Sequence, residues 1–118
     1  GKLGSIGFCW GGGMVNQLAV HTPELNAAIC FYGMAPDLTL VPQIKAYMLL
    51  QYAGDDERIN EGRDAYENAL KKDHIAFESY TYEGVQHAFN NDTNEARYNK
   101  AAADLAWSRS MAMFKDKL

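Results

Sequence analysis

The chain has 118 residues, 47% of them hydrophobic, and a formal net charge of −4. This length is enough for one hydrophobic core and too short for two. Lysines and arginines number 11 against 15 acidic residues and are scattered, which excludes an extended nucleic-acid-binding surface. No apolar run approaches the roughly 18 residues that a membrane-spanning helix needs, so neither a nucleic acid nor a membrane is an expected partner.

The first half of the chain predicts two strands around one helix. Residues 2–8 are short and apolar, which is typical of a buried strand in a parallel sheet. Residues 12–21 predict a helix, which Thr22-Pro23 ends. A second apolar strand is expected at 26–32, and a loop with two prolines, Pro36 and Pro42, follows it.

The second half repeats the alternation of strands and helices. Strands are expected at 46–53 and 75–82. A helix is expected at 60–72 with Asn60 as its N-cap, and a last helix at 94–117. Strands that alternate with helices predict an α/β fold with a mainly parallel sheet flanked by helices. Helical spacing predicts one apolar face on the last helix, made of Ala103, Trp107, Met111, Phe114 and Leu118.

The two cysteines are too few for a disulfide framework. Cys9 lies in a glycine-rich turn, and Cys30 lies inside an apolar strand, where core packing is its expected role. We therefore expect two free thiols in a reducing compartment, which predicts a cytoplasmic location.

Residues 7–11 read Gly-Phe-Cys-Trp-Gly. This is the G-x-C-x-G pattern of a nucleophile elbow, with cysteine in the place usually held by serine. A sharp strand-to-helix turn strains the central residue, and glycines two positions away on either side relieve the crowding. The following helix N-terminus favours a thiolate at Cys9. An ordinary tight turn around a cysteine is the alternative interpretation.

A cysteine nucleophile needs a base, and the three histidines differ in position. His21 ends a predicted helix, where a cation suits the helix dipole, and His74 lies in an exposed turn. His87 lies in the loop after the last predicted strand. Loops at the carboxyl ends of parallel strands converge on the site in open α/β sheets, so His87 is the candidate base.

The orienting acid is expected in the acidic turn that follows the third predicted strand. Asp55, Asp56 and Glu57 are consecutive there, and we expect one aspartate to face inward and the other to face water. A solvated acidic loop is the alternative interpretation. The chain order cysteine, acid, histidine is that of the α/β-hydrolases rather than of the known protease orders.

These motifs resemble the dienelactone hydrolase family, also called carboxymethylenebutenolidases. The elbow, continued by Gly12, matches the family's G-x-C-x-G-G, and residues 56–59 match its D-x-x-[VI], which selects Asp56 as the acid. A glycine before and an aromatic residue after the histidine also match, here Gly84 and Phe89. The resemblance covers residues 1–118 and implies one truncated domain, the C-terminal half of an α/β-hydrolase fold.

The resemblance implies hydrolysis of an ester or lactone by Cys9, His87 and Asp56 through a thioester, with no cofactor and no metal. The backbone N–H of Trp10 is the implied oxyanion donor, and the second donor belongs to the half that this chain lacks. Phe89 and Gly12 are candidate substrate-binding residues, although Phe89 can equally be a core aromatic and Gly12 can equally serve tight helix–strand packing. No arginine follows His87 before Arg97, so dienelactone itself is not the expected substrate.

The sequence bears on three other classes of protein. A nucleotide-binding module is disfavoured because G-x-G-x-x-G and Gly-Lys-Ser/Thr are absent, and a thiol redox protein because C-x-x-C is absent. The stronger alternative is a non-catalytic fragment or assembly module of a hydrolase fold, because the strand at 2–8 would be left as an open sheet edge. Besides a small-molecule ester or lactone, we therefore expect either a homo-oligomer or a partner chain that supplies the missing half.

Overall fold

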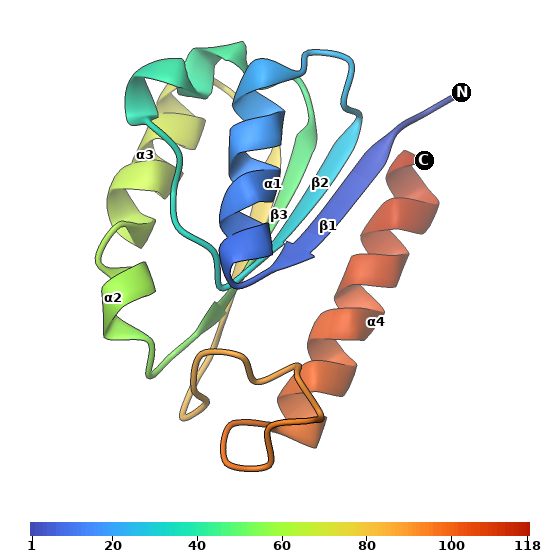
Figure 1. The fold of residues 1–118 in the computed structure, drawn as a ribbon. Helices are drawn as coiled ribbons and strands as arrows, with labels where there is room; N and C mark the ends of the chain where they lie inside the picture. Colours follow the sequence, from blue (N-terminus) through green and yellow to red (C-terminus); the bar gives the residue numbers. More distant parts are fainter.

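The computed structural model describes residues 1–118 and contains one sheet of four parallel strands. The strands follow one another across the sheet in chain order (Figure 1). They are β1 (Gly4–Phe8), β2 (Ala27–Phe31), β3 (Tyr47–Ala53) and β4 (Phe77–Tyr82). All four strands expected from the sequence are present, and their parallel arrangement confirms the predicted α/β class.

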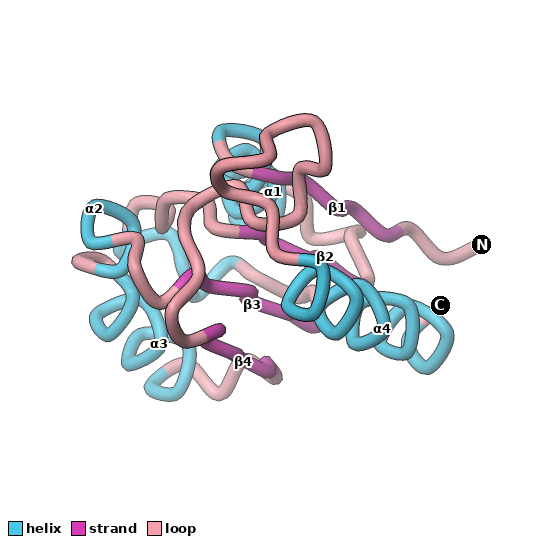
Figure 2. The backbone as a smooth tube through the Cα atoms, turned by 90° about the horizontal axis from the view of Figure 1, so that it is seen from below, coloured by secondary structure: helices cyan, strands magenta, loops and turns pink.

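Helices cover both faces of the sheet (Figure 2). On one face lie α1 (Trp10–His21), α3 (Arg63–Lys72), and the short 3₁₀ helix η1 (Leu38–Gln43). On the other face lies α4 (Lys100–Lys117). Alternate residues of each central strand enter opposite cores, so that Leu50 packs towards α1 and α3 while Leu49 packs towards α4. All five residues of β2 are buried for this reason.

The helix predicted from Asn60 onward is interrupted. A single turn, α2 (Glu57–Asn60), precedes α3, and Asn60 does not cap either helix. Its side-chain amide donates a hydrogen bond to the carbonyl of Ala53 at 2.7 Å. The amide of Asn60 thus ties the turn to the carboxyl end of β3, and the predicted N-cap role was wrong.

The last helix begins at Lys100 rather than at residue 94. Asn99 is its N-cap, because the Asn99 side chain accepts a hydrogen bond from the backbone N–H of Ala102 at 3.0 Å. The proline-containing loop likewise contains more structure than expected. There Asp37 accepts a hydrogen bond from the N–H of Thr39 and caps η1.

The buried face of α4 differs in part from the predicted one. Ala103 is buried and Phe114 packs against the core, as predicted, whereas Trp107, Met111 and Leu118 are exposed. The helix buries mainly small residues: Ala102, Ala103, Ala106 and Ser110, together with Met113. A buried glutamine explains the orientation. Gln51 of β3 donates hydrogen bonds to the carbonyl of Ala106 at 3.0 Å and to the Ser110 hydroxyl at 3.3 Å, so the helix must present its small side to the sheet.

β1 forms one edge of the sheet and pairs only with β2. Apolar side chains beside this edge are exposed, among them Leu3, Met14 and Leu18. The N- and C-termini lie close together near the same edge (Figure 1). None of the helices is both long and apolar enough to span a lipid bilayer.

Candidate active site

Cys9 stands at the turn between β1 and α1 with φ 57° and ψ −122°. This is the strained conformation that the elbow pattern predicts. A Cβ atom on Gly7 would lie 2.3 Å from the carbonyl oxygen of Gly11, so residue 7 must be glycine. A Cβ on Gly11 would meet nothing within 4 Å, so crowding does not explain the second glycine of the motif in this structure.

Gly12 serves helix packing rather than substrate contact. It is buried, and a Cβ there would lie 2.6 Å from the carbonyl oxygen of Phe31 and 3.2 Å from the Cα of Gly33. The first turn of α1 can approach the end of β2 only because this side chain is absent. The packing interpretation of Gly12 therefore has direct support in the structure, whereas its substrate-binding role stays a prediction.

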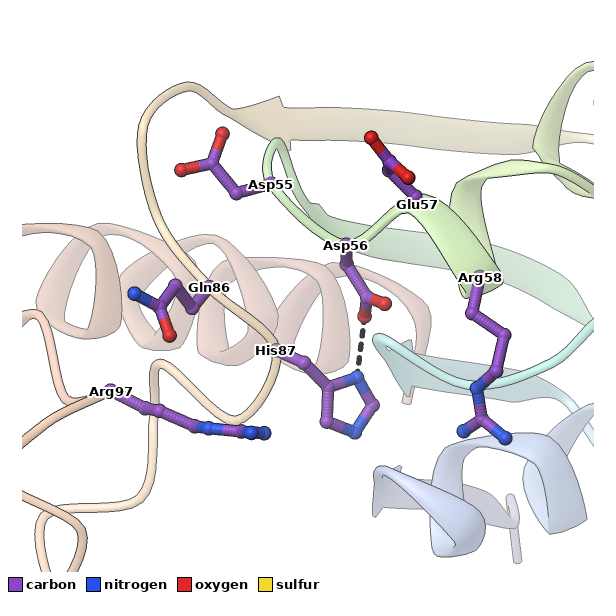
Figure 3. A pocket seen from close by; sticks show the side chains of 7 residues that line it. All are labelled: Asp55, Asp56, Glu57, Arg58, Gln86, His87 and Arg97. Carbon is purple, nitrogen blue, oxygen red and sulfur yellow. Dashed lines mark hydrogen bonds and ion pairs between the residues drawn. The ribbon is translucent and has the colours of Figure 1, made fainter.

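His87 and Asp56 meet at the carboxyl edge of the sheet (Figure 3). The Nδ1 atom of His87 is hydrogen-bonded to Oδ2 of Asp56. Asp56 is buried at 8% exposure, whereas Asp55 and Glu57 are exposed. The structure thus brings together the acid and histidine selected from the sequence, and it turns Asp55 towards water as expected. His21 and His74 are both exposed.

Cys9 and His87 line the same cavity, of about 260 Å³. No hydrogen bond joins the thiol to the imidazole in this structure. Most of the residues that line the cavity are apolar, and they include Met14, Met34 and Ile59. The cavity can therefore hold an apolar group beside the thiol and within reach of a base.

The surroundings of Cys9 oppose ionisation of the thiol. Burial raises the pKa of Cys9, the negative charge of Asp56 raises it further, and Arg97 lowers it. The helix N-terminus that was expected to favour a thiolate therefore does not outweigh burial and the charge of Asp56. A base has to take the proton when the thiol reacts.

Two arginines flank His87 at the mouth of the site (Figure 3). Arg58 and Arg97 line an open cavity of about 520 Å³ together with Asp56 and His87. Both arginines are exposed, and neither forms an ion pair with a carboxylate. No group of three or more histidine, cysteine or acidic side chains is arranged to hold a metal ion.

Trp10 and Phe89, the two aromatic residues expected at the site, have different surroundings in the structure. Trp10 is 80% exposed, lines the cavity beside Cys9, and as the first residue of α1 has a backbone N–H without an intrahelical partner. Phe89 is fully buried and packs against the rings of Tyr32 and Tyr82, with centroids 5.2 Å away in each case. The structure does not support substrate contact for Phe89, because its ring belongs to the core and lines neither of the cavities that Cys9 lines.

Sequence reasoning did not identify several residues that surround Cys9. Tyr32, Met34 and Arg58 line cavities next to the thiol. Tyr32 and Met34 follow the carboxyl end of β2, and Arg58 lies within the matched D-x-x-[VI] segment. All three lie at or after the carboxyl end of a predicted strand, where functional loops converge, and this position could have identified them from the sequence.

Comparisons with known proteins agree with this geometry. The profile of the dienelactone hydrolase family matches residues 1–118. The chain is 42% identical over 109 residues to the "Putative carboxymethylenebutenolidase" of Saccharolobus solfataricus, covering 92% of this chain and 42% of that protein. It is 32% identical to a protein of the same description from Escherichia coli, covering 97% of this chain and 46% of that one.

Solved structures of dienelactone hydrolases and of similar proteins superpose closely on the chain. The crystal structure titled "Putative Dienelactone Hydrolase" from Klebsiella pneumoniae superposes with a TM-score of 0.88 at 30% identity, covering 96% of this chain and 51% of that chain. A dienelactone hydrolase-like promiscuous phosphotriesterase from metagenomic libraries has a TM-score of 0.90 at 21% identity, covering 98% and 52%, and supports the fold alone. The chain spans about half the length of the curated relatives it matches. With the profile match over its whole length, the chain belongs to the dienelactone hydrolase family.

Proposed function

We propose that the complete protein hydrolyses a carboxylic ester or lactone by a Cys9–His87–Asp56 triad and a thioester intermediate. The observation that carries the proposal is the Asp56–His87 hydrogen bond beside a strained Cys9, with the thiol and the imidazole in one cavity. Family membership supports hydrolysis of this bond type. The two free cysteines support a reducing compartment, and we propose the cytoplasm.

Acylation begins with proton transfer from the Cys9 thiol to His87. Because Asp56 accepts a hydrogen bond at Nδ1 of His87, the Nε2 atom is the one that takes the proton. The sulfur attacks the carbonyl carbon, and the backbone N–H of Trp10 stabilises the oxyanion. The tetrahedral intermediate collapses as His87 returns the proton to the leaving oxygen, which releases the alcohol and leaves an acyl thioester on Cys9.

Deacylation repeats these steps with water. His87 removes a proton from a water molecule, which attacks the thioester carbonyl. The second tetrahedral intermediate expels the sulfur, and His87 protonates it to restore the thiol. The net reaction consumes one water and gives an acid and an alcohol, or a hydroxy acid from a lactone. Asp56 stabilises the positive charge on His87 in both halves of the reaction.

Mass spectrometry of the complete polypeptide tests the proposal. During turnover of p-nitrophenyl butyrate, we expect the intact mass to rise by one butyryl group, located on the peptide that contains Cys9. Cys9→Ala should abolish both the adduct and the hydrolysis. Cys30→Ala is the matched control, because Cys30 is buried in the core, and this variant should retain both. An adduct elsewhere, or full activity in Cys9→Ala, would overturn the proposal.

A second candidate is a non-catalytic assembly module of a hydrolase fold. The open edge of β1 and the apolar side chains beside it favour this role. The same experiment discriminates between the two. A folded protein with no ester turnover and no acyl adduct would favour the assembly role.

A further inference from the structure

Tyr32 has an unusual backbone conformation at the site. It directly follows β2, has φ 40°, and its N–H donates to the carbonyl of Gln51 at 2.7 Å. Only four non-glycine residues have positive φ, and three of them, Cys9, Tyr32 and Ala88, lie at or next to the candidate triad. Strained backbone of this kind persists only where the surrounding structure holds it in place, and such residues cluster at active and ligand-binding sites.

The Tyr32 side chain packs against the histidine and lines a cavity with the cysteine. Its ring centroid is 5.0 Å from that of His87. Burial raises the pKa of the Tyr32 hydroxyl far above its usual range, a charge on Cys9 raises it further, and the backbone N–H of Asn90 lowers it. The hydroxyl therefore stays protonated, and no group in the structure accepts a hydrogen bond from it. Tyr32 is thus a hydrogen-bond donor without a partner next to Cys9.

Tyr32 and Cys9 line a second cavity, of about 280 Å³, with Phe8, Asn90 and Asn91. Most of the lining of this cavity is apolar; the Tyr32 phenol and two carboxamides supply its polar groups, and no lysine or arginine lines it. The side-chain oxygen of Asn91 already accepts hydrogen bonds from the N–H and hydroxyl of Thr93. The lining suits a largely apolar group with one neutral hydrogen-bond acceptor, and it offers no positive charge to an anion.

The position of His87 decides which part of an ester occupies each cavity. His87 lines the cavity of about 260 Å³ and does not line the cavity of about 280 Å³ that Tyr32 lines. In the proposed function, His87 must reach the leaving oxygen to protonate it. The leaving group therefore belongs in the cavity that His87 lines, and the acyl group belongs in the cavity that Tyr32 lines.

We propose that the cavity lined by Tyr32 and Cys9 is the acyl subsite and that the Tyr32 hydroxyl donates a hydrogen bond to a neutral oxygen in the acyl chain. Tyr32 is then a substrate-binding and specificity-determining residue. The substrate class is an ester or lactone whose acyl part carries an ether, hydroxyl or keto oxygen near the scissile carbonyl. This inference rests on the proposed triad, because the assignment of the two cavities uses the role of His87.

Two esters of equal size and identical leaving group test the inference in the complete polypeptide. p-Nitrophenyl methoxyacetate differs from p-nitrophenyl butyrate by one oxygen in place of a methylene group. Tyr32→Phe should lower kcat/KM for the methoxyacetate by about 3- to 10-fold, the usual effect of one neutral hydrogen bond, and leave the butyrate within about twofold. Comparing each ester between wild type and variant cancels their different intrinsic reactivity.

Tyr52→Phe is the matched control. Tyr52 is also buried, its hydroxyl makes no hydrogen bond with another side chain, and it belongs to the core on the opposite face of the sheet. This variant should change neither ester. If Tyr32→Phe lowers kcat/KM equally for both esters, Tyr32 acts by packing against His87. If it lowers kcat/KM for neither ester, Tyr32 does not contact the substrate. Either result overturns the inference, while the acyl adduct on Cys9 reports separately on the proposed function.

Discussion

The two thiols of the chain differ in their surroundings. Burial raises the pKa of Cys30 to about 12, and the side-chain amide of Asn16 donates a hydrogen bond to its sulfur at 3.3 Å. Cys9 is only partly buried and lines two cavities. The same functional group is therefore inert in β2 and accessible at the elbow.

Asp55 and Asp56 are adjacent in the sequence, so the same substitution at each position tests which aspartate belongs to the triad. Asp56→Asn should lower kcat by about 10⁴-fold, as in serine triads, because an amide no longer stabilises the charged imidazole or selects its tautomer. Asp55→Asn removes the same charge from an exposed position and should leave kcat within about twofold. Steady-state kinetics of both variants in the complete polypeptide provide the measurement.

The pair of variants also controls for long-range electrostatics. The negative charge of Asp56 raises the pKa of Cys9, so its removal by itself favours the thiolate. A large loss of kcat in Asp56→Asn would therefore reflect the histidine and not the ionisation of the thiol. Similar losses in both variants would contradict the role of Asp56.

At the level of elements, the sequence predicted the types of structure more reliably than their ends. The elbow and the four strands follow from local patterns, because apolar strands and a strained G-x-C-x-G turn leave few other arrangements. The ends of the helices depended on side-chain contacts that the pattern does not reveal. Asn60 could cap a helix as well as Asn99, and only the proximity of the Ala53 carbonyl gives it another partner.

The buried face of α4 was predicted only in part, for a related reason. Trp107 and Met111 have the expected spacing, but a buried Gln51 and its hydrogen bonds to α4 bring the alanine side of the helix against the sheet. Tyr82 adds to this network by donating to Gln51 Oε1 at 2.6 Å. Contacts between residues 31 to 59 positions apart are set by the tertiary fold, so hydrophobic spacing alone could not reveal them.

The glycines of α1 give a test at the scale of an element. Gly12→Ala should destabilise the chain by about 1–3 kcal/mol, because the new Cβ would lie 2.6 Å from the backbone oxygen of Phe31. Gly11→Ala has open space and a helical backbone, so it should be neutral or stabilising by up to about 1 kcal/mol. Thermal unfolding followed by circular dichroism compares the two. A stable Gly12→Ala variant would show that α1 can move away from β2.

At the scale of the whole molecule, the two edges of the sheet differ. β4 is followed by the loops that carry His87 and lead to α4, whereas β1 is bordered by exposed apolar side chains. Leu18 and Met14 of α1 line a shallow cavity against Ile6 of β1. An edge of this kind has backbone N–H and C=O groups free to pair with another strand, and its apolar surroundings favour association.

We therefore expect the isolated 118-residue chain to associate at micromolar concentration, with a mass by light scattering above the 13.2 kDa of one chain. Leu18→Lys should weaken this association, because it places a charge beside the β1 edge. Leu38→Lys is the matched control: Leu38 is 37% exposed against 39% for Leu18, but it lies on η1. A monodisperse monomer with cooperative unfolding would show that the open edge is tolerated. Equal effects of the two lysines would place the contact away from β1.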